Sequence, residues 1–280
     1  MKKLTIIGSS GFVGKSLNDY FKQKSNIKII NYSRKQKKNI INIKKLPQTD
    51  YIIYCINNKN IKVSLRYFNH FKKLLKESSK KIKIVFFSSG AVYGPRSIKK
   101  KFRETEKIDK SKYNNFLGYK KNYSREKYIL EKEFKKIAKE GFNVSIARGF
   151  SFYGKHIINY DYLISKIILA VKQKKTIQIK NANIRRSYMH ADDMCRWLIK
   201  IVNISSNKCP IVNLGSDKML NLSKFAHFLN KKFNSNILVA KNDLRKIDFY
   251  VPSIIFAKKY LKLKNTVNFN NAIISLIKKK

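Results

Sequence analysis

The chain has 280 residues and a mass of 32.9 kDa, and 43% of its residues are hydrophobic, so it can bury a sizeable core and is not disordered as a whole. Its 63 lysines and arginines outnumber its 16 aspartates and glutamates and give a net charge of +47, but only ten of the basic residues are arginines. Because arginine makes most of the paired contacts to phosphates and bases, this balance predicts nonspecific attraction to polyanions and argues against a specific nucleic-acid function.

The first half of the chain alternates between strand and helix patterns. Strands are predicted at residues 4–7, 27–32, 51–56, 82–87 and 143–147, and helices at 63–75 and 123–139. A further helical pattern follows the first strand and runs through Leu17, Tyr20 and Phe21. Strands that alternate with helices predict a doubly wound parallel sheet with right-handed crossovers, which is an α/β fold. Residues 96–117 are polar and lack a periodic pattern, so they predict a long surface loop.

Beyond residue 155 the alternation is looser. Helices are predicted at residues 162–172, 192–202 and 222–230, and short strands at 176–179 and 211–214. We therefore predict a dinucleotide-binding domain at residues 1–155 and a smaller mixed α/β substrate lobe at residues 156–280. Residues 187–205 or so are expected to pack back on the first domain.

The chain shows no sign of secretion or membrane insertion. Its first apolar run covers only residues 4–7, and no run approaches the roughly 20 apolar residues that span a bilayer. Cys55, Cys195 and Cys209 have neither disulfide nor zinc spacing. These features predict a cytoplasmic protein with no membrane partner and no metal site.

Three glycines follow the first strand and open the first helix. Gly8 allows a tight turn, Gly11 lets backbone N–H groups approach a pyrophosphate, and Gly14 lets the helix pack closely on the sheet. This context predicts a dinucleotide site of the Rossmann type. The expected cofactor-binding residues of the turn are Gly8, Ser10, Gly11, Phe12, Val13 and Gly14.

The end of the second strand decides which cofactor is preferred. An acidic residue there would bind a ribose hydroxyl and select NAD, but residues 31–35 contain none. Ser33 and Arg34 could instead bind a 2′-phosphate, so the sequence predicts NADP, with NAD as the alternative. In a chain so rich in lysine, a solvated basic turn is the competing interpretation.

Tyr123 and Lys127 are four residues apart on a predicted helix, which places both side chains on one face. A nearby ammonium favours the phenolate, so such a pair can exchange protons near neutral pH. The spacing also arises by chance in this chain, for example at Tyr128 and Lys132. Tyr123 is singled out by its position, after the fourth strand and downstream of residues 88–94.

Several segments occur in an order that resembles the extended short-chain dehydrogenases. They are the glycine turn, residues 88–94, the Tyr123 and Lys127 pair, and residues 147–154, 186–193, 212–216 and 250–252. Together they are similar to the NAD-dependent epimerase/dehydratase family, which acts on nucleotide-diphosphate sugars. Members of this family often form dimers, so the resemblance implies a homodimer as one option, although the high charge opposes it at low salt.

The resemblance implies a role for individual residues. Tyr123 would exchange a proton with the sugar, Lys127 would lower the pKa of Tyr123 and hold the nicotinamide ribose, and Ser89 would bind the sugar oxygen. The implied catalytic residues are thus Ser89, Tyr123 and Lys127. The implied substrate-binding residues are Ser89, Ser151, Arg186 at the diphosphate, and Arg245 as a weaker candidate for a second contact.

Gly90 and Ala91 limit the reactions that the resemblance allows. Dehydratases of the family commonly carry acids directly after the catalytic serine or threonine, whereas this chain has Gly90 and Ala91. We therefore expect hydride transfer to a 4-keto-6-deoxysugar, with Tyr123 as the proton donor. The alternatives are a nucleotide-sugar epimerase, a dehydratase that recruits its acid elsewhere, and a non-catalytic NADP-binding protein.

Overall fold

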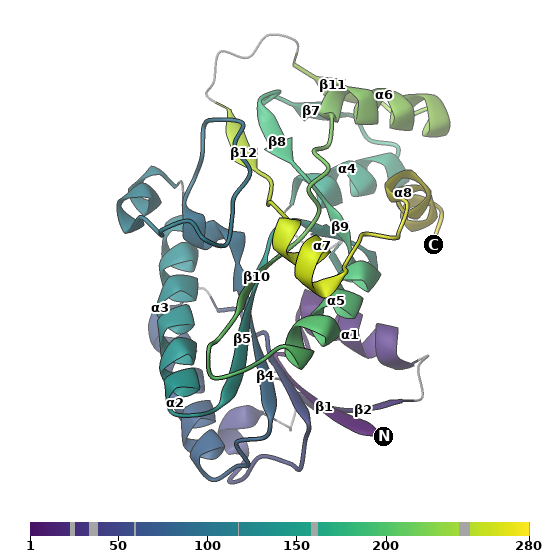
Figure 1. Cartoon of the computed structure of the whole chain (residues 1–280). Helices are drawn as coiled ribbons and strands as arrows, with labels where there is room; N and C mark the ends of the chain where they lie inside the picture. The colour runs from purple at the N-terminus through teal and green to yellow at the C-terminus, as the bar shows by residue number, and fades with distance from the viewer. Residues whose placement is uncertain are drawn as a thin grey trace.

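A six-stranded parallel sheet forms the centre of the molecule (Figure 1). The computed structural model describes residues 1–22, 26–33, 39–58, 60–116, 118–157, 162–240 and 247–279. The strands of the sheet are β1 (Lys2–Ile7), β2 (Ile27–Tyr32), β3 (Tyr51–Tyr54), β4 (Lys83–Ser89), β5 (Asn143–Gly149) and β10 (Ile211–Leu214). Their order is β10-β5-β4-β3-β1-β2, so the predicted doubly wound parallel sheet is confirmed.

Helices cover both faces of the sheet. The helices against it are α1 (Phe12–Lys22), α2 (Ile61–Lys76), α3 (Lys120–Lys139) and α5 (Ala191–Asn203). Helices α1 and α5 pack on one face with the apolar side chains of β1, whereas α2 and α3 pack on the other (Figure 1). Because both faces are covered, the central strands are apolar runs rather than alternating patterns.

Phe134 fixes helix α3 on the sheet. Its ring stacks on Phe86 of β4 with centroids 4.5 Å apart and meets Phe68 of α2 edge to face at 5.1 Å. All three rings are fully buried. This cluster holds the second half of α3 against the middle of β4.

The second half of the chain builds a smaller layer beyond the carboxyl edge of the sheet (Figure 1). Its helices are α4 (Leu163–Lys172), α6 (Leu222–Phe233) and α8 (Phe269–Lys278), whereas α7 (Ile255–Leu261) packs in the core of the main sheet with α1 and α5. Its strands are β6 (Phe152–Tyr153), β7 (Ile177–Ile179), β8 (Ile184–Arg186), β9 (Met189–His190), β11 (Ile237–Val239) and β12 (Asp248–Tyr250). These strands form the parallel pairs β6 with β9, β7 with β11 and β8 with β12.

Two segments differ from the sequence predictions. Residues 211–214, predicted in the second lobe, form β10 at the edge of the main sheet, where Ile211 is opposite Ile146 of β5. Residues 96–117, predicted as a surface loop, bury the side chains of Phe102 and Tyr113. Isolated aromatic residues leave no periodic pattern, so the sequence alone did not reveal this anchoring.

Helix α5 lies against the main sheet, with the Trp197 ring fully buried among side chains of β1 and α1. The Trp197 indole N–H donates to the carbonyl of Lys264 at 3.3 Å.

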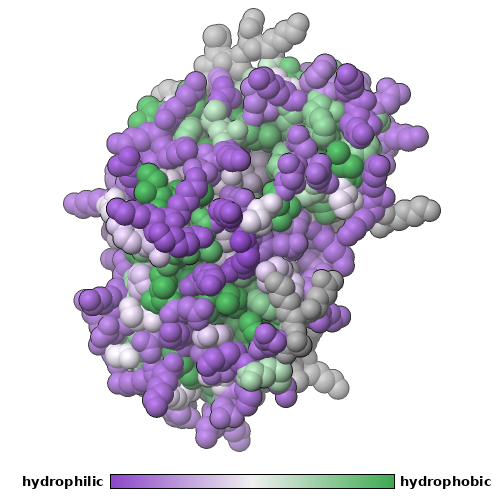
Figure 2. Space-filling model, turned by 45° about the vertical axis from the view of Figure 1, so that its right-hand side comes forward, coloured by the Kyte–Doolittle hydropathy of each residue, from purple (hydrophilic) through white to green (hydrophobic). Residues whose placement is uncertain are grey.

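The division of the chain into two domains at residue 155 stays a prediction. Hydrophilic residues cover most of the face in Figure 2, and apolar residues form smaller patches between them.

Candidate active site

The candidate site lies at the carboxyl edge of the sheet, where β1 separates β2 from β3. Strand β2 lies on one side of β1 and β3 on the other, so the crossover direction reverses at β1. Ligands of doubly wound sheets bind at this reversal, outside the carboxyl ends of the strands. The turn after β1 is therefore the expected position of a cofactor site.

Each glycine of the turn after β1 has its own surroundings. Gly8 has a φ of +107°, and a Cβ there would lie 2.8 Å from the carbonyl carbon of Cys55. A Cβ on Gly14 would lie 2.4 Å from the Cα of Ser9. At Gly11, by contrast, a Cβ would meet only the carbonyl oxygen of Gly8, at 3.5 Å. Gly8 and Gly14 are thus required by packing, whereas Gly11 leaves an open face.

This open face lies beside the N-terminus of helix α1. The first N–H groups of a helix have no partners within the helix, and the helix dipole favours negative charge there. The neighbouring Ser10, Phe12 and Val13 are half-buried at the same turn. The backbone geometry fits a pyrophosphate, and with it a dinucleotide.

The end of β2 carries no acid in its described part, residues 31–33. The side-chain amides of Asn31 and Asn18 bind one another at 2.7 and 3.1 Å. Ser33 is buried next to the end of the strand. Arg34, the expected partner of a 2′-phosphate, lies outside the described residues.

The structure brings Ser89, Tyr123 and Lys127 together. Ser89 ends β4, and its Oγ accepts a hydrogen bond from the Ala91 N–H at 3.2 Å. Tyr123 lies in the first turn of α3, and Lys127 follows one turn later with its Nζ 5.6 Å from the centre of the Tyr123 ring. Burial raises the pKa of Tyr123, and its interaction with the Ser89 hydroxyl opposes that rise.

Lys127 is anchored beside the glycine turn. Its Nζ donates to the carbonyl oxygen of Ile56 at 3.0 Å, and Ile56 borders Gly8. The side chain is almost fully buried, and burial lowers the pKa of Lys127. A carboxylate oxygen of Glu126, itself buried and bonded to the Ser64 hydroxyl at 2.8 Å, lies 3.8 Å from this nitrogen. Glu126 therefore opposes the loss of the lysine charge.

Tyr250 belongs to this constellation, and our sequence analysis did not assign it a role. Its hydroxyl lies 3.4 Å from Ser89 Oγ and 3.5 Å from the carbonyl oxygen of Gly149. Burial raises the pKa of Tyr250 to about 12. The available signal was the segment 250–252, which was part of the family resemblance but carried no assigned function.

The residues expected to bind the substrate differ in their contacts. Arg186 ends β8, and its guanidinium donates to the carbonyl of Asp248 at 2.7 Å and to its carboxylate at 2.5 Å. Ser151 is half-buried, and its carbonyl accepts from the Met189 N–H at 3.0 Å. Arg245 lies outside the described residues.

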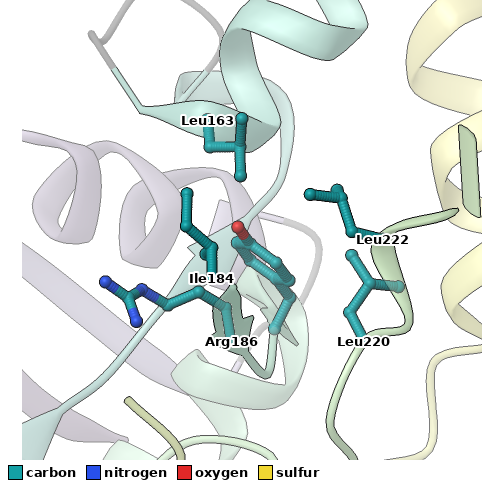
Figure 3. A pocket seen from close by; sticks show the side chains of 6 residues that line it. Leu163, Ile184, Arg186, Leu220 and Leu222 are labelled. Atoms are coloured by element: carbon teal, nitrogen blue, oxygen red, sulfur yellow. The ribbon is translucent and has the colours of Figure 1, made fainter. Parts of the chain in front are cut away.

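An apolar pocket adjoins Arg186 in the second layer. Its lining residues are Leu163, Ile184, Arg186, Tyr188, Leu220 and Leu222. In Figure 3 the side chains of Leu163, Ile184, Leu220 and Leu222 lie around an aromatic ring, and the Arg186 side chain lies to one side of them.

Other polar residues near the site have structural contacts. The Asp193 carboxylate accepts from the backbone N–H groups of Thr266 and Val267 at 2.9 and 3.1 Å. His190 Nδ1 accepts from the Asp192 N–H at 3.1 Å and caps α5.

Within the described part of the chain, no group of three or more His, Cys, Asp or Glu side chains could hold a metal ion. No helix there is long and apolar enough to cross a membrane.

The chain resembles known proteins in sequence pattern and in fold. A model of the NAD-dependent epimerase/dehydratase family matches residues 4–215. A UDP-N-acetylglucosamine 4-epimerase from Methanobrevibacter ruminantium M1, solved with UDP-N-acetylmuramic acid, has a TM-score of 0.76 at 17% identity over 99% of this chain and 97% of its own. No curated protein matches the sequence.

Two further solved structures have the same architecture. A dTDP-glucose 4,6-dehydratase from Bacillus anthracis str. Ames, in complex with NAD, has a TM-score of 0.79 at 15% identity, covering 99% of this chain and 96% of its own. RMD from Pseudomonas aeruginosa, complexed with NADPH, has a TM-score of 0.77 at 15% identity, covering 99% and 98%. At such identities the likeness establishes the fold alone.

Proposed function

Because the chain belongs to the NAD-dependent epimerase/dehydratase family, we propose that it is an NADP-linked oxidoreductase that reduces a 4-keto-6-deoxysugar carried on a nucleotide diphosphate. The observation that carries the proposal is the approach of Ser89, Tyr123 and Lys127 to one another. These three side chains meet at the sheet edge that also carries the glycine turn, because Lys127 donates to the carbonyl of Ile56 beside Gly8.

In the proposed reaction, a reduced nicotinamide dinucleotide supplies a hydride to the carbonyl carbon of the sugar. Tyr123 gives its phenolic proton to the carbonyl oxygen, so that carbon and oxygen together gain the two hydrogens of an alcohol. Ser89 donates a hydrogen bond to the same oxygen, which stabilises the negative charge that develops there. The ammonium of Lys127 stabilises the phenolate that Tyr123 leaves behind.

The preference for NADP over NAD rests on the sequence after β2. Residues 31–33 supply no carboxylate to a ribose hydroxyl, and Arg34 supplies a guanidinium that can pair with a 2′-phosphate. The homodimer and the cytoplasmic location stay predictions. For the substrate, Arg186 would bind the diphosphate.

The packing of Gly90 supports a reductase over a dehydratase. A Cβ on Gly90 would lie 2.6 Å from the ring of Phe150, so an acidic side chain cannot enter at this position unless the ring moves. The position that commonly carries an acid in dehydratases of the family is thus filled by an aromatic ring. An epimerase needs no acid there and would use the same three residues, so the assay must separate a reductase from an epimerase.

The test is turnover of a panel of nucleotide-diphosphate sugars and their 4-keto-6-deoxy forms, with NADPH and NADH in parallel. We expect one NADPH to be consumed per keto-sugar reduced, with a lower KM for NADPH than for NADH. Product formation without net consumption of NADPH would indicate an epimerase and would overturn the reductase proposal. A preference for NADH of more than tenfold would overturn the cofactor assignment.

Gly11→Ala should separate cofactor binding from folding. The new methyl group makes only an ordinary contact within the protein, but it stands where a pyrophosphate must approach the backbone. We expect the Kd for NADPH to rise at least about tenfold, measured by fluorescence titration, with an unchanged Tm of the free protein. Gly14→Ala is the matched control and should lower the Tm, because its Cβ overlaps the Cα of Ser9. Wild-type NADPH affinity in Gly11→Ala would contradict the proposed site.

A further inference from the structure

Tyr250 brings a second phenol to Ser89, from a strand of the second layer. Its hydroxyl lies within 3.4 Å of Ser89 Oγ, whereas Tyr123 reaches the same serine from helix α3. We propose that Tyr250 is a positioning residue, which holds the Ser89 hydroxyl so that its proton points to the sugar oxygen. This inference rests on the proposed reduction of a keto-sugar.

The Ser89 hydroxyl can form only a limited number of hydrogen bonds. A serine hydroxyl offers one proton and can accept two hydrogen bonds. The Ala91 N–H already donates to Ser89 Oγ at 3.2 Å. The proposed role requires Tyr250 to give its one proton to Ser89 Oγ rather than to the Gly149 carbonyl. Both acceptor positions of the serine are then used, and its own proton can turn from Tyr123 to a bound substrate. The substrate atom is the sugar oxygen in the proposed reaction, so Tyr250 makes Ser89 a donor there.

The Tyr250 hydroxyl lies beside the ends of two neighbouring strands of the main sheet. Ser89 of β4 and Gly149 of β5 are opposite one another in the parallel register, and the Tyr250 hydroxyl lies 3.4 and 3.5 Å from atoms of these two residues. Its ring packs against Phe150 with centroids 4.7 Å apart. Because burial keeps the phenol protonated at neutral pH, Tyr250 has one proton to donate, and Ser89 Oγ and the Gly149 carbonyl are both within its reach.

Tyr250 is also coupled to the proposed diphosphate site. Strands β8 and β12 pair so that Arg186 is opposite Tyr250, and the Arg186 guanidinium lies 5.3 Å from the centre of the Tyr250 ring. The carbonyl of Asp248 accepts from this guanidinium at 2.7 Å and ties the two strands together. One pair of strands thus carries both the cation for the diphosphate and the phenol that orients the serine.

The first test is Tyr250→Phe, which keeps the ring and removes only the hydroxyl. We expect kcat for the keto-sugar to fall about three- to tenfold, which is the loss expected for one neutral hydrogen bond. The KM should stay within about twofold, because the ring still packs against Arg186 and Phe150. Tyr260→Phe is the matched control and should leave kcat unchanged, because Tyr260 is exposed on α7.

The second test is a double-mutant cycle with Ser89→Ala. If Tyr250 acts through Ser89, then Tyr250→Phe should cause no further loss of single-turnover rate in the Ser89→Ala background. Losses that multiply, or an unchanged kcat in Tyr250→Phe alone, would overturn the inference. Failure of the proposed function is distinct, since the wild-type enzyme would then turn over no member of the keto-sugar panel.

Discussion

Tyr123→Phe should lower kcat for reduction of the keto-sugar by about a thousandfold or more, with little change in the Kd for NADPH. The variant lacks the only proton that the proposed reaction places on the sugar oxygen, and proton transfer by a positioned side chain contributes about 10²- to 10⁴-fold. The aromatic ring remains, so its packing and the 5.6 Å approach of Lys127 should persist. The measurement is single-turnover oxidation of bound NADPH, followed by absorbance.

Tyr128→Phe is a matched control on the same helix. Tyr128 also has a lysine four residues on, and Lys132 Nζ lies 5.1 Å from the centre of its ring. This pair therefore has the same spacing and a similar geometry, but Tyr128 lies five residues further along α3 than Tyr123 and so on a different side of the helix. We expect Tyr128→Phe to retain wild-type kcat. If Tyr123→Phe retained it as well, the proposed role of Tyr123 would be wrong.

Reduction should be faster at lower pH across the titration of Tyr123. The reaction needs the protonated phenol, and burial raises the pKa of Tyr123 and so extends the protonated form to higher pH. The rate of the reverse reaction, oxidation of the alcohol, should show the opposite dependence, because it needs the phenolate.

The first half of the fold was predictable because its signals are local. The glycine turn at Gly8 directly follows β1 and opens α1, and the crossovers after β3 and β4 each contain an amphipathic helix. Strand β10 was assigned to the wrong layer because its partner β5 is distant in sequence: Ile211 pairs with Ile146. A four-residue apolar run does not reveal whether it joins a large sheet or a small one.

The candidate site was predictable to the same extent. Tyr123 was recognisable by its position in a helix after the fourth strand and Lys127 by its spacing from Tyr123, whereas Ser89 was named through the family resemblance. The structure brings the three side chains together. Tyr250 could not be assigned, because its approach to Ser89 depends on contacts between distant segments, among them the pairing of β12 with β8. That pairing is a property of the second layer, where short strands have weak periodic signals.

The largest expected loss of stability is for Glu131→Ala. Glu131 of α3 accepts two hydrogen bonds from the Arg148 guanidinium of β5, at 2.7 and 3.0 Å, and one from the Ser88 hydroxyl at 2.6 Å. Both charged side chains are about 97% buried or more. Removal of the carboxylate leaves an unpaired buried guanidinium, so we expect the free energy of unfolding to fall by about 3–5 kcal/mol in urea denaturation.

Glu133→Ala is the control for this loss, because it removes a carboxylate from the same helix. The Glu133 carboxylate pairs with Lys136, whose side chain is 62% exposed, and such a pair contributes at most about 1 kcal/mol. Since Ser88 and Arg148 are opposite one another on β4 and β5, the Glu131 network also holds the strand end that carries Ser89. Glu131→Ala should therefore lower kcat even at temperatures where it stays folded, whereas Glu133→Ala should not. Equal stability of the two variants would show that the buried pair contributes no more than the exposed one.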